Sequence, residues 1–153
     1  MRIPRSVLVA LDRRFPAPVV HAHCDGPCWV YDPASARIAG EAVLSMTKKI
    51  LDLGDDHSIE TENTRSRYIA IKEEQAELVK RELNILWHDY FKPPHLEDYP
   101  DLHTTFWNAA KQASACKTSV SVDNADELMS MIENIHNIFW ATKGRDVPWY
   151  TAS

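Results

Sequence analysis

Hydrophobic residues recur at helical spacing in four separate blocks of the chain. The first block covers residues 33–52, and its predicted inward positions are Ile38, Ala42, Val43, Met46 and Ile50. One face of a helix repeats every three or four positions, which is the pattern seen here. Asp32 suits the cap of this helix and Pro33 its first position, while Gly54 suits its end.

The second block is longer and covers residues 58–90. Its predicted apolar stripe comprises Tyr68, Ile69, Ile71, Leu78, Val79 and Leu86. The opposite face is predicted to be solvated and carries Lys72, Glu73, Lys80, Arg81 and Glu82. Pro93 ends the block, because proline lacks a backbone N–H and restricts the residue before it.

Two further blocks complete the pattern. The third covers residues 100–117, with inward positions Leu102, Phe106, Ala109, Ala110 and Ala113. The fourth covers residues 123–143, with inward positions Leu128, Met131, Ile132, Ile135 and Phe139, and Gly144 suits its end. Residues 145–153 are predicted to form an extended arm. Four amphipathic helices with short links predict an all-α protein, an antiparallel up-and-down four-helix bundle.

Composition narrows the class of protein. The 153 residues suit one domain, with 44% hydrophobic and 25% charged residues. No apolar run approaches the ~18 residues that a membrane span needs, so we expect no membrane partner. The net charge is −5, of which residues 1–22 carry +3, so the remainder carries −8. An acidic body argues against nucleic acid as a partner.

Residues 1–22 are basic, contain three prolines and are predicted to be a pro-segment. The apolar stretch at residues 6–11 is shorter than the ~7–15 residues of a secretory core, and Asp12, Arg13 and Arg14 follow it at once. We therefore expect no secretory signal and a cytoplasmic protein. An ordinary N-terminal arm is the alternative interpretation.

The three cysteines indicate a local site and not a disulfide framework. Cys116 lies among apolar helical positions and is predicted to be a buried thiol. Cys24 and Cys28 are separated by Asp25-Gly26-Pro27, whose glycine and proline favour a tight turn. By itself this pair is a weak signal, because zinc needs about four ligands and no second pair of cysteines exists.

His23, directly before Cys24, strengthens the signal. If the chain were cut between Ala22 and His23, the new terminus would offer an α-amine, an imidazole, the amide nitrogen of Cys24 and two thiolates. Amine, amide and two thiolates form a square-planar set, which suits nickel(II) or copper(II), with the imidazole on the axis. We therefore predict an N-terminal metal-binding hook at residues 23–31, called the metal hook below.

Several motifs carry a resemblance to a known family. The first is His23-Cys24-Asp25-Gly26-Pro27-Cys28, followed by Val30-Tyr31-Asp32-Pro33-Ala34 and Ala36-Arg37-Ile38. The others are Ile71-Lys72-Glu73, Leu86-Trp87-x-Asp89-Tyr90-Phe91-Lys92-Pro93-Pro94-His95, Tyr99-Pro100-x-Leu102-His103 and Ile138-Phe139-Trp140-x-Thr142-Lys143. Across residues 21–143, the chain resembles nickel superoxide dismutases, and the first motif is highly specific to that family.

The resemblance implies conversion of superoxide to dioxygen and hydrogen peroxide by Ni(III)/Ni(II) cycling, with one nickel ion per chain. It implies that a maturation peptidase removes residues 1–22, leaving residues 23–153 as the bundle with its hook, and that the protein is a homohexamer. The implied ligands are the amine and ring of His23, the amide nitrogen and sulfur of Cys24, and the sulfur of Cys28.

The resemblance also implies roles for residues around the metal. Tyr31 would screen its open face, and Asp25 would help to shape the pocket. Tyr90 would hydrogen-bond near Tyr31, with Lys92 beside it. Since an acidic body repels superoxide, the positive charge of Lys92 is expected to steer the anion inward.

The chain departs from the family pattern at three positions. Well-known members place a glutamate against the axial imidazole and an arginine behind it, where this chain has Ala39 and Gln75. Groups behind a ligand fix its orientation and basicity, so the axial His23 would be held differently here. Trp29 stands where a glycine is usual. None of these three changes removes a residue that is predicted to bind the metal.

Two other functions fit the cysteine pair. A nickel- or copper-binding store or metallochaperone would share the hook without needing Tyr31 or Tyr90. A thiol–disulfide redox protein using Cys24 and Cys28 would act without metal.

Overall fold

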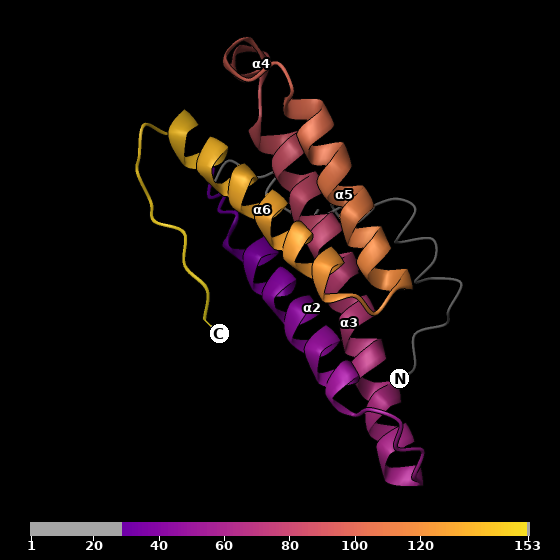
Figure 1. Ribbon diagram of the computed structural model, residues 1–153. Helices are drawn as coiled ribbons and strands as arrows, with labels where there is room; N and C mark the ends of the chain where they lie inside the picture. Colours follow the sequence, from indigo (N-terminus) through magenta and orange to yellow (C-terminus); the bar gives the residue numbers. More distant parts are fainter. Residues whose placement is uncertain (1–28, 153) are drawn as a thin grey trace, which may run out of the picture.

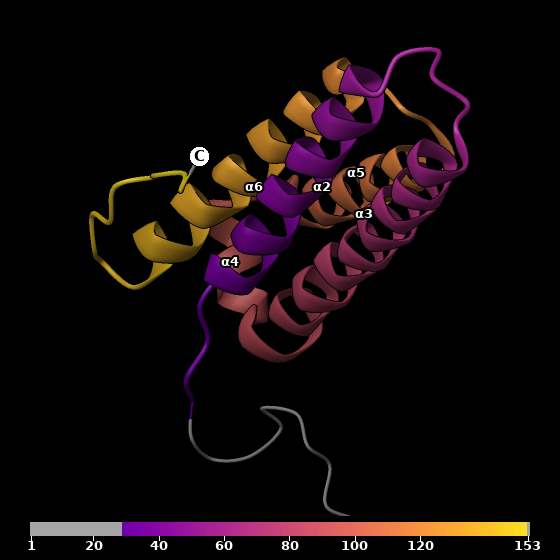
Figure 2. The same ribbon diagram turned by 90° about the horizontal axis from the view of Figure 1, so that it is seen from below.

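The computed structural model describes residues 29–152 of the chain. The elements are α2 (Ala34–Asp52), α3 (Ile59–Ile85), the π-helical turn η1 (Leu86–Tyr90), α4 (Pro93–Asp98), α5 (Leu102–Thr118) and α6 (Val122–Thr142). The four long helices lie alongside one another as a bundle (Figures 1 and 2). No strand occurs among residues 29–152, so the predicted all-α bundle is confirmed.

The predicted helix ends agree with the local chemistry of the chain. Asp32 Oδ1 accepts a hydrogen bond from the backbone N–H of Ala34 at 2.8 Å, at the start of α2. Ser58 caps α3 by accepting from the backbone N–H of Thr61 at 3.2 Å. Gly144 follows α6 with φ at 63°, a left-handed conformation that glycine adopts without a steric penalty.

The chain between α3 and α5 differs from the prediction. The expected helix to residue 90 ends as a single π-helical turn, in which the backbone N–H of Phe91 bonds to the carbonyl of Leu86 at 3.1 Å. The short helix α4 was not predicted. Pro93 and Pro94 occupy its first positions, where the backbone N–H has no helical partner anyway, so the residues that end one helix also begin the next.

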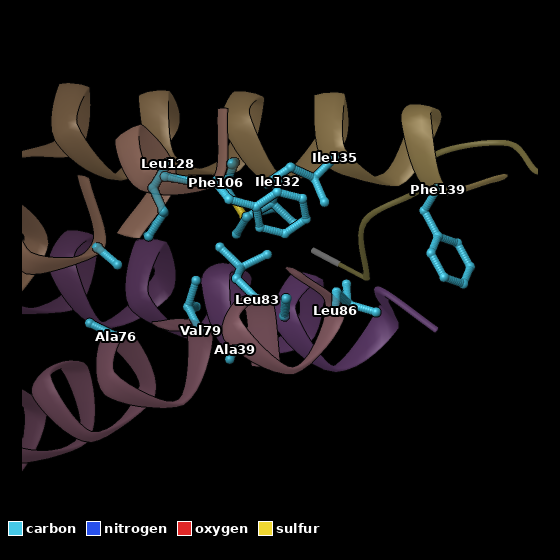
Figure 3. Close-up of a cluster of buried hydrophobic side chains, with 14 of the residues drawn as sticks. Ala39, Ala76, Val79, Leu83, Leu86, Phe106, Leu128, Ile132, Ile135 and Phe139 are labelled. Carbon is cyan, nitrogen blue, oxygen red and sulfur yellow. The ribbon is translucent and has the colours of Figure 1, made fainter. Parts of the chain in front are cut away.

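The core lies between the four long helices (Figure 3). Its labelled members are Ala39, Ala76, Val79, Leu83, Leu86, Phe106, Leu128, Ile132, Ile135 and Phe139. Gly40 on α2 faces α6 so closely that an added Cβ would lie 2.7 Å from Ile132 Cδ1 and 2.8 Å from Met129 Sδ. A side chain at position 40 would therefore displace the side-chain ends of Ile132 and Met129. Within residues 29–152, no helix combines the length and apolar character needed to cross a membrane.

Two of the predicted inward positions are wrong, and one predicted surface position is buried. Ile38 and Ile71 are 57% and 39% exposed, whereas Lys72 is 1% exposed. The core face of α2 is formed largely by small residues, including Ala36 and Ala39, which spacing of large side chains does not reveal. On α3, Lys72 takes the buried place predicted for Ile71, and its ammonium has hydrogen-bond partners at the end of α5.

Lys72 closes the end of α5. Its ammonium donates to the carbonyl of Cys116, to that of Lys117 at 3.0 Å and to that of Ser119 at 2.7 Å. The last carbonyls of a helix lack backbone partners and carry partial negative charge, so a buried cation is stabilised there. Burial lowers the pKa of Lys72, while the neighbouring Glu73 acts in the opposite direction.

The Cys116 thiol is buried and free, as predicted. It donates to the carbonyl of Asn124 at 3.3 Å, which ties the end of α5 to the start of α6. Burial raises the pKa of Cys116, so its thiolate form is disfavoured.

We expect Lys72→Met to lower the free energy of unfolding by about 2–4 kcal/mol, because methionine fills the space but leaves the α5 carbonyls without a donor. Chemical denaturation would measure this. The matched control is Lys80→Met on the same helix, where only a 3.8 Å pair with Glu77 is lost and a change of about 0.5 kcal/mol is expected. Equal losses in the two variants would contradict the capping role.

Candidate metal centre

The predicted ligands lie outside the described residues. His23, Cys24 and Cys28, together with Asp25, precede residue 29, as does the predicted pro-segment. Among residues 29–152, no group of three or more His, Cys, Asp or Glu side chains is placed to hold a metal ion. Of the metal hook, the structure describes Trp29, Val30 and Tyr31.

Of the hook residues that the structure describes, Tyr31 is the one in the core. Only 9% of its surface is exposed, and its ring lies 5.6 Å from the ring of Tyr90 at a tilt of 55°. Asp32 and Pro33 then lead directly into α2. The sequence placed both tyrosines at the metal site, and the structure brings these two together from segments far apart in the chain.

Trp29, in contrast to Tyr31, lies at the surface. Its side chain is 67% exposed, and its φ of 54° lies in the left-handed region. This conformation costs roughly 1–2 kcal/mol for a residue that bears a Cβ, and nothing for glycine. The backbone at position 29 thus has the geometry that favours glycine, although the chain carries tryptophan there.

Tyr90 lies at the centre of an aromatic cluster that packs against Tyr31. Its ring is 4.5 Å from Phe139 on α6, 5.0 Å from Phe91 and 5.7 Å from the nearly parallel ring of His95 on α4. The π-helical turn η1 presents Tyr90 to α6, and the bend after it returns His95 to the same ring. We call this group of rings, with Tyr31, the aromatic floor.

Hydrogen bonds fix the Tyr90 hydroxyl. Thr142 Oγ1 lies 2.7 Å from Tyr90 Oη and also donates to the carbonyl of Phe139 at 2.7 Å. Since Thr142 has one hydroxyl proton and gives it to that carbonyl, Tyr90 is the donor in the pair. The Tyr90 oxygen then keeps its acceptor capacity for a donor from another direction.

Two lysines bring positive charge to the aromatic floor. Lys143 Nζ lies 5.2 Å from the ring centroid of Tyr90 and 5.0 Å from that of Phe139. Lys92 is exposed, and its ammonium donates to the carbonyl of Asp89 at 3.0 Å. The sequence singled out Lys92 but missed Lys143 and Thr142 as neighbours of the site. Both belong to the quoted motif at the end of the fourth block, which was the available signal.

Positions 39 and 75 supply no charge to the site. Ala39 is buried in the core, and Gln75 is half-buried on α3. The buried charges on α2 are instead Arg37 and Glu41, one turn apart, with Nη1 and Oε2 separated by 2.7 Å.

The donor chemistry ahead of Trp29 decides which metal fits. Two thiolates with amine and amide nitrogens suit a square-planar ion such as nickel(II), and an imidazole adds an axial ligand. Cys116 is excluded from such a set, because its thiol donates to a carbonyl inside the bundle.

Comparisons with known proteins also indicate nickel. Residues 18–143 match the family described as nickel-containing superoxide dismutase. A nickel superoxide dismutase of Streptomyces seoulensis is 46% identical over 134 residues, which are 87% of this chain and 98% of that relative. One of Streptomyces coelicolor is 43% identical over the same share of each chain.

Solved structures give the same result for the fold. A native nickel superoxide dismutase superposes with a TM-score of 0.73 at 41% identity, covering 80% of this chain and 100% of that chain. A nickel-containing superoxide dismutase with the ligation of its oxidised state gives 0.72 at 43% identity, with the same coverage.

The Tyr90–Thr142 pair can be tested by a double-mutant cycle. We expect Tyr90→Phe and Thr142→Val each to lower the free energy of unfolding by about 1 kcal/mol, because each breaks a half-buried hydrogen bond. The double variant should lose less than the sum of the two, since the second change removes a bond that is already broken. Strictly additive losses from denaturation would show that the hydroxyls are not coupled.

Proposed function

Because the chain belongs to the nickel-containing superoxide dismutase family, we propose that its nickel is held by the metal hook. The protein is an oxidoreductase that converts superoxide to dioxygen and hydrogen peroxide. In the proposed site, the ligands are the amine and ring of His23, the amide nitrogen and sulfur of Cys24, and the sulfur of Cys28. Bound nickel supplies a Ni(III)/Ni(II) couple for one-electron exchange with superoxide. Family membership favours catalysis over a metal store or metal-free thiol exchange.

The observation that carries the proposal is the burial of Tyr31 on the aromatic floor, three residues after Cys28. A tyrosine fixed by packing against Tyr90 fixes the end of the hook as well. We assign Tyr31 to order superoxide and water beside the metal and Asp25 to shape the pocket. Tyr90, whose own proton is committed to Thr142, holds Tyr31 by ring packing and is not assigned as a proton donor.

Positive charge near the floor supports the approach of an anion. The chain carries a net charge of −5, so superoxide meets a repulsive overall field. Lys143 lies over the ring of Tyr90, and Lys92 bonds to the carbonyl of Asp89, the residue before Tyr90, so both attract the anion locally. We assign the steering role to both lysines, where the sequence named Lys92 alone.

Maturation, assembly and location complete the proposal. We assign removal of residues 1–22 to a peptidase, because only a free amine at His23 completes the square-planar set. A homohexamer is inferred from the resemblance to nickel superoxide dismutases, and exposed apolar side chains such as Ile38 and Trp107 are available for contacts between copies. A cytoplasmic location is supported by the charges at residues 12–14, which interrupt the apolar stretch that a secretory signal would need.

Replacement of either hook thiol tests the ligand assignment. We expect Cys24→Ser and Cys28→Ser to abolish nickel binding and superoxide decay, because a serine hydroxyl does not replace a thiolate donor. Cys116→Ser is the matched control, and it should retain nickel and activity with only a loss of stability. Elemental analysis and a superoxide decay assay measure both quantities. Stoichiometric nickel in a hook variant would refute the assignment.

Mass spectrometry of the active, nickel-loaded protein tests the role of the amine. We expect a chain that begins at His23, because an uncut chain has an amide nitrogen there and lacks one strong donor. Blocking cleavage by Ala22→Pro should leave the bundle folded and free of nickel. Full activity in a protein that retains residues 1–22 would show that the amine is not a ligand.

A further inference from the structure

The C-terminal residues return along the bundle after α6 ends. Residues 144–152, called the strap below, turn at Gly144 and run back beside α6 and α2 (Figures 1 and 2). The match to the family ends at residue 143, so the strap lies outside the part of the chain that the family profile covers.

The strap is first attached to α6. The Arg145 guanidinium carbon lies 4.7 Å from the ring centroid of Trp140. The carbonyl of Val147 lies 2.9 Å from His136 Nε2, and the ring of Trp149 lies 5.3 Å from the His136 ring. A buried histidine on α6 is thus held between backbone and indole of the strap.

The end of the strap is attached to α2. The Arg37 guanidinium carbon lies 4.3 Å from the ring centroid of Tyr150, and the backbone N–H of Ala152 donates to Glu41 Oε1 at 2.6 Å. Glu41 thus receives Arg37 on one carboxylate oxygen and the strap on the other. The ion pair is buried, with 6% and 9% of the two residues exposed, although both belong to one helix.

The contact between the strap and the Arg37–Glu41 pair matters for stability because the pair is buried. An exposed pair one turn apart contributes about 0.3–0.5 kcal/mol, whereas removing one partner of a buried ionic contact costs several times more. The strap contacts both members of the pair, Arg37 through Tyr150 and Glu41 through Ala152. The strap therefore contributes packing and desolvated charge at the first two turns of α2, which begin just after Tyr31.

The other end of the strap starts at the aromatic floor. Lys143, the residue before Gly144, lies over the rings of Tyr90 and Phe139. The segment thus runs from the floor under Tyr31, across α6, to the helix that follows Tyr31. It connects the floor that packs against Tyr31 with the helix that follows Tyr31.

We propose that the strap is a positioning element for the nickel site: it holds the first turns of α2 against α6 and so fixes Tyr31, the end of the metal hook, on the aromatic floor. The proposal rests on the nickel ligands assigned above. Arg37 and Glu41 are positioning residues in it, because they act through α2 and contact no substrate.

The experiment compares the processed full-length protein with a chain that ends at Arg145 and with a control that lacks only Ser153. In the nickel-free proteins, we expect the amides of residues 35–41 to exchange with deuterium about tenfold faster after truncation, and those of residues 76–83 in α3 to be unchanged. In the loaded proteins, we expect nickel affinity to fall about tenfold and the axial nitrogen splitting of the Ni(III) paramagnetic resonance signal to broaden.

A second variant keeps the test decisive if the truncated chain does not fold. Trp149→Ala combined with Tyr150→Ala retains the backbone of the strap and should reproduce both changes in weaker form. Unchanged exchange at residues 35–41 would overturn the proposal. Faster exchange with an unaltered resonance signal and nickel affinity would also overturn it, since the strap would then only stabilise α2. A full-length protein that binds no nickel would overturn the proposed function, and the exchange comparison would still report on the hold upon α2.

Discussion

The antiparallel packing of α2 against α6, in contact at Gly40, is the constraint on which the arrangement of the site depends. With no Cβ at position 40, Ile132 and Met129 of α6 pack directly on the α2 backbone. The two helices run in opposite directions, so the start of α2 and the end of α6 meet at one end of the bundle (Figure 2). Tyr31 before α2 and Thr142 at the end of α6 consequently reach the same tyrosine, Tyr90.

Two buried charges secure this arrangement in different ways. Lys72 is paired with backbone carbonyls at the end of α5, so its partners are present whenever that helix is formed. The Arg37–Glu41 pair is buried and is contacted by the strap at both members. Buried ionic groups contribute little net stability over an apolar core but are costly to separate, so both arrangements favour one relative placement of their elements over the alternatives.

The sequence predicted the long helices because hydrophobic spacing and end signals such as Gly144 are local properties. It placed Lys72 on the surface and Ile71 inside, since the reason for burying a lysine is a carbonyl cluster on another helix. The sequence does not predict α4, because consecutive prolines such as Pro93 and Pro94 signal the end of a helix as readily as the start of one. The ligands and Tyr31 came from the hook motif, whereas the contributions of Thr142 and Lys143 depend on how η1 meets α6. The aromatic floor is evident only in the tertiary structure, because its rings come from separate segments of the chain.

The strap also has a consequence for the timing of synthesis. The metal hook precedes residues 144–152 in the chain, so it leaves the ribosome first. At typical elongation rates, the interval between the two is on the order of ten seconds. The contacts of Tyr150 with Arg37 and of Ala152 with Glu41 can form only after that interval. A nascent chain therefore presents the hook before the strap reaches α2.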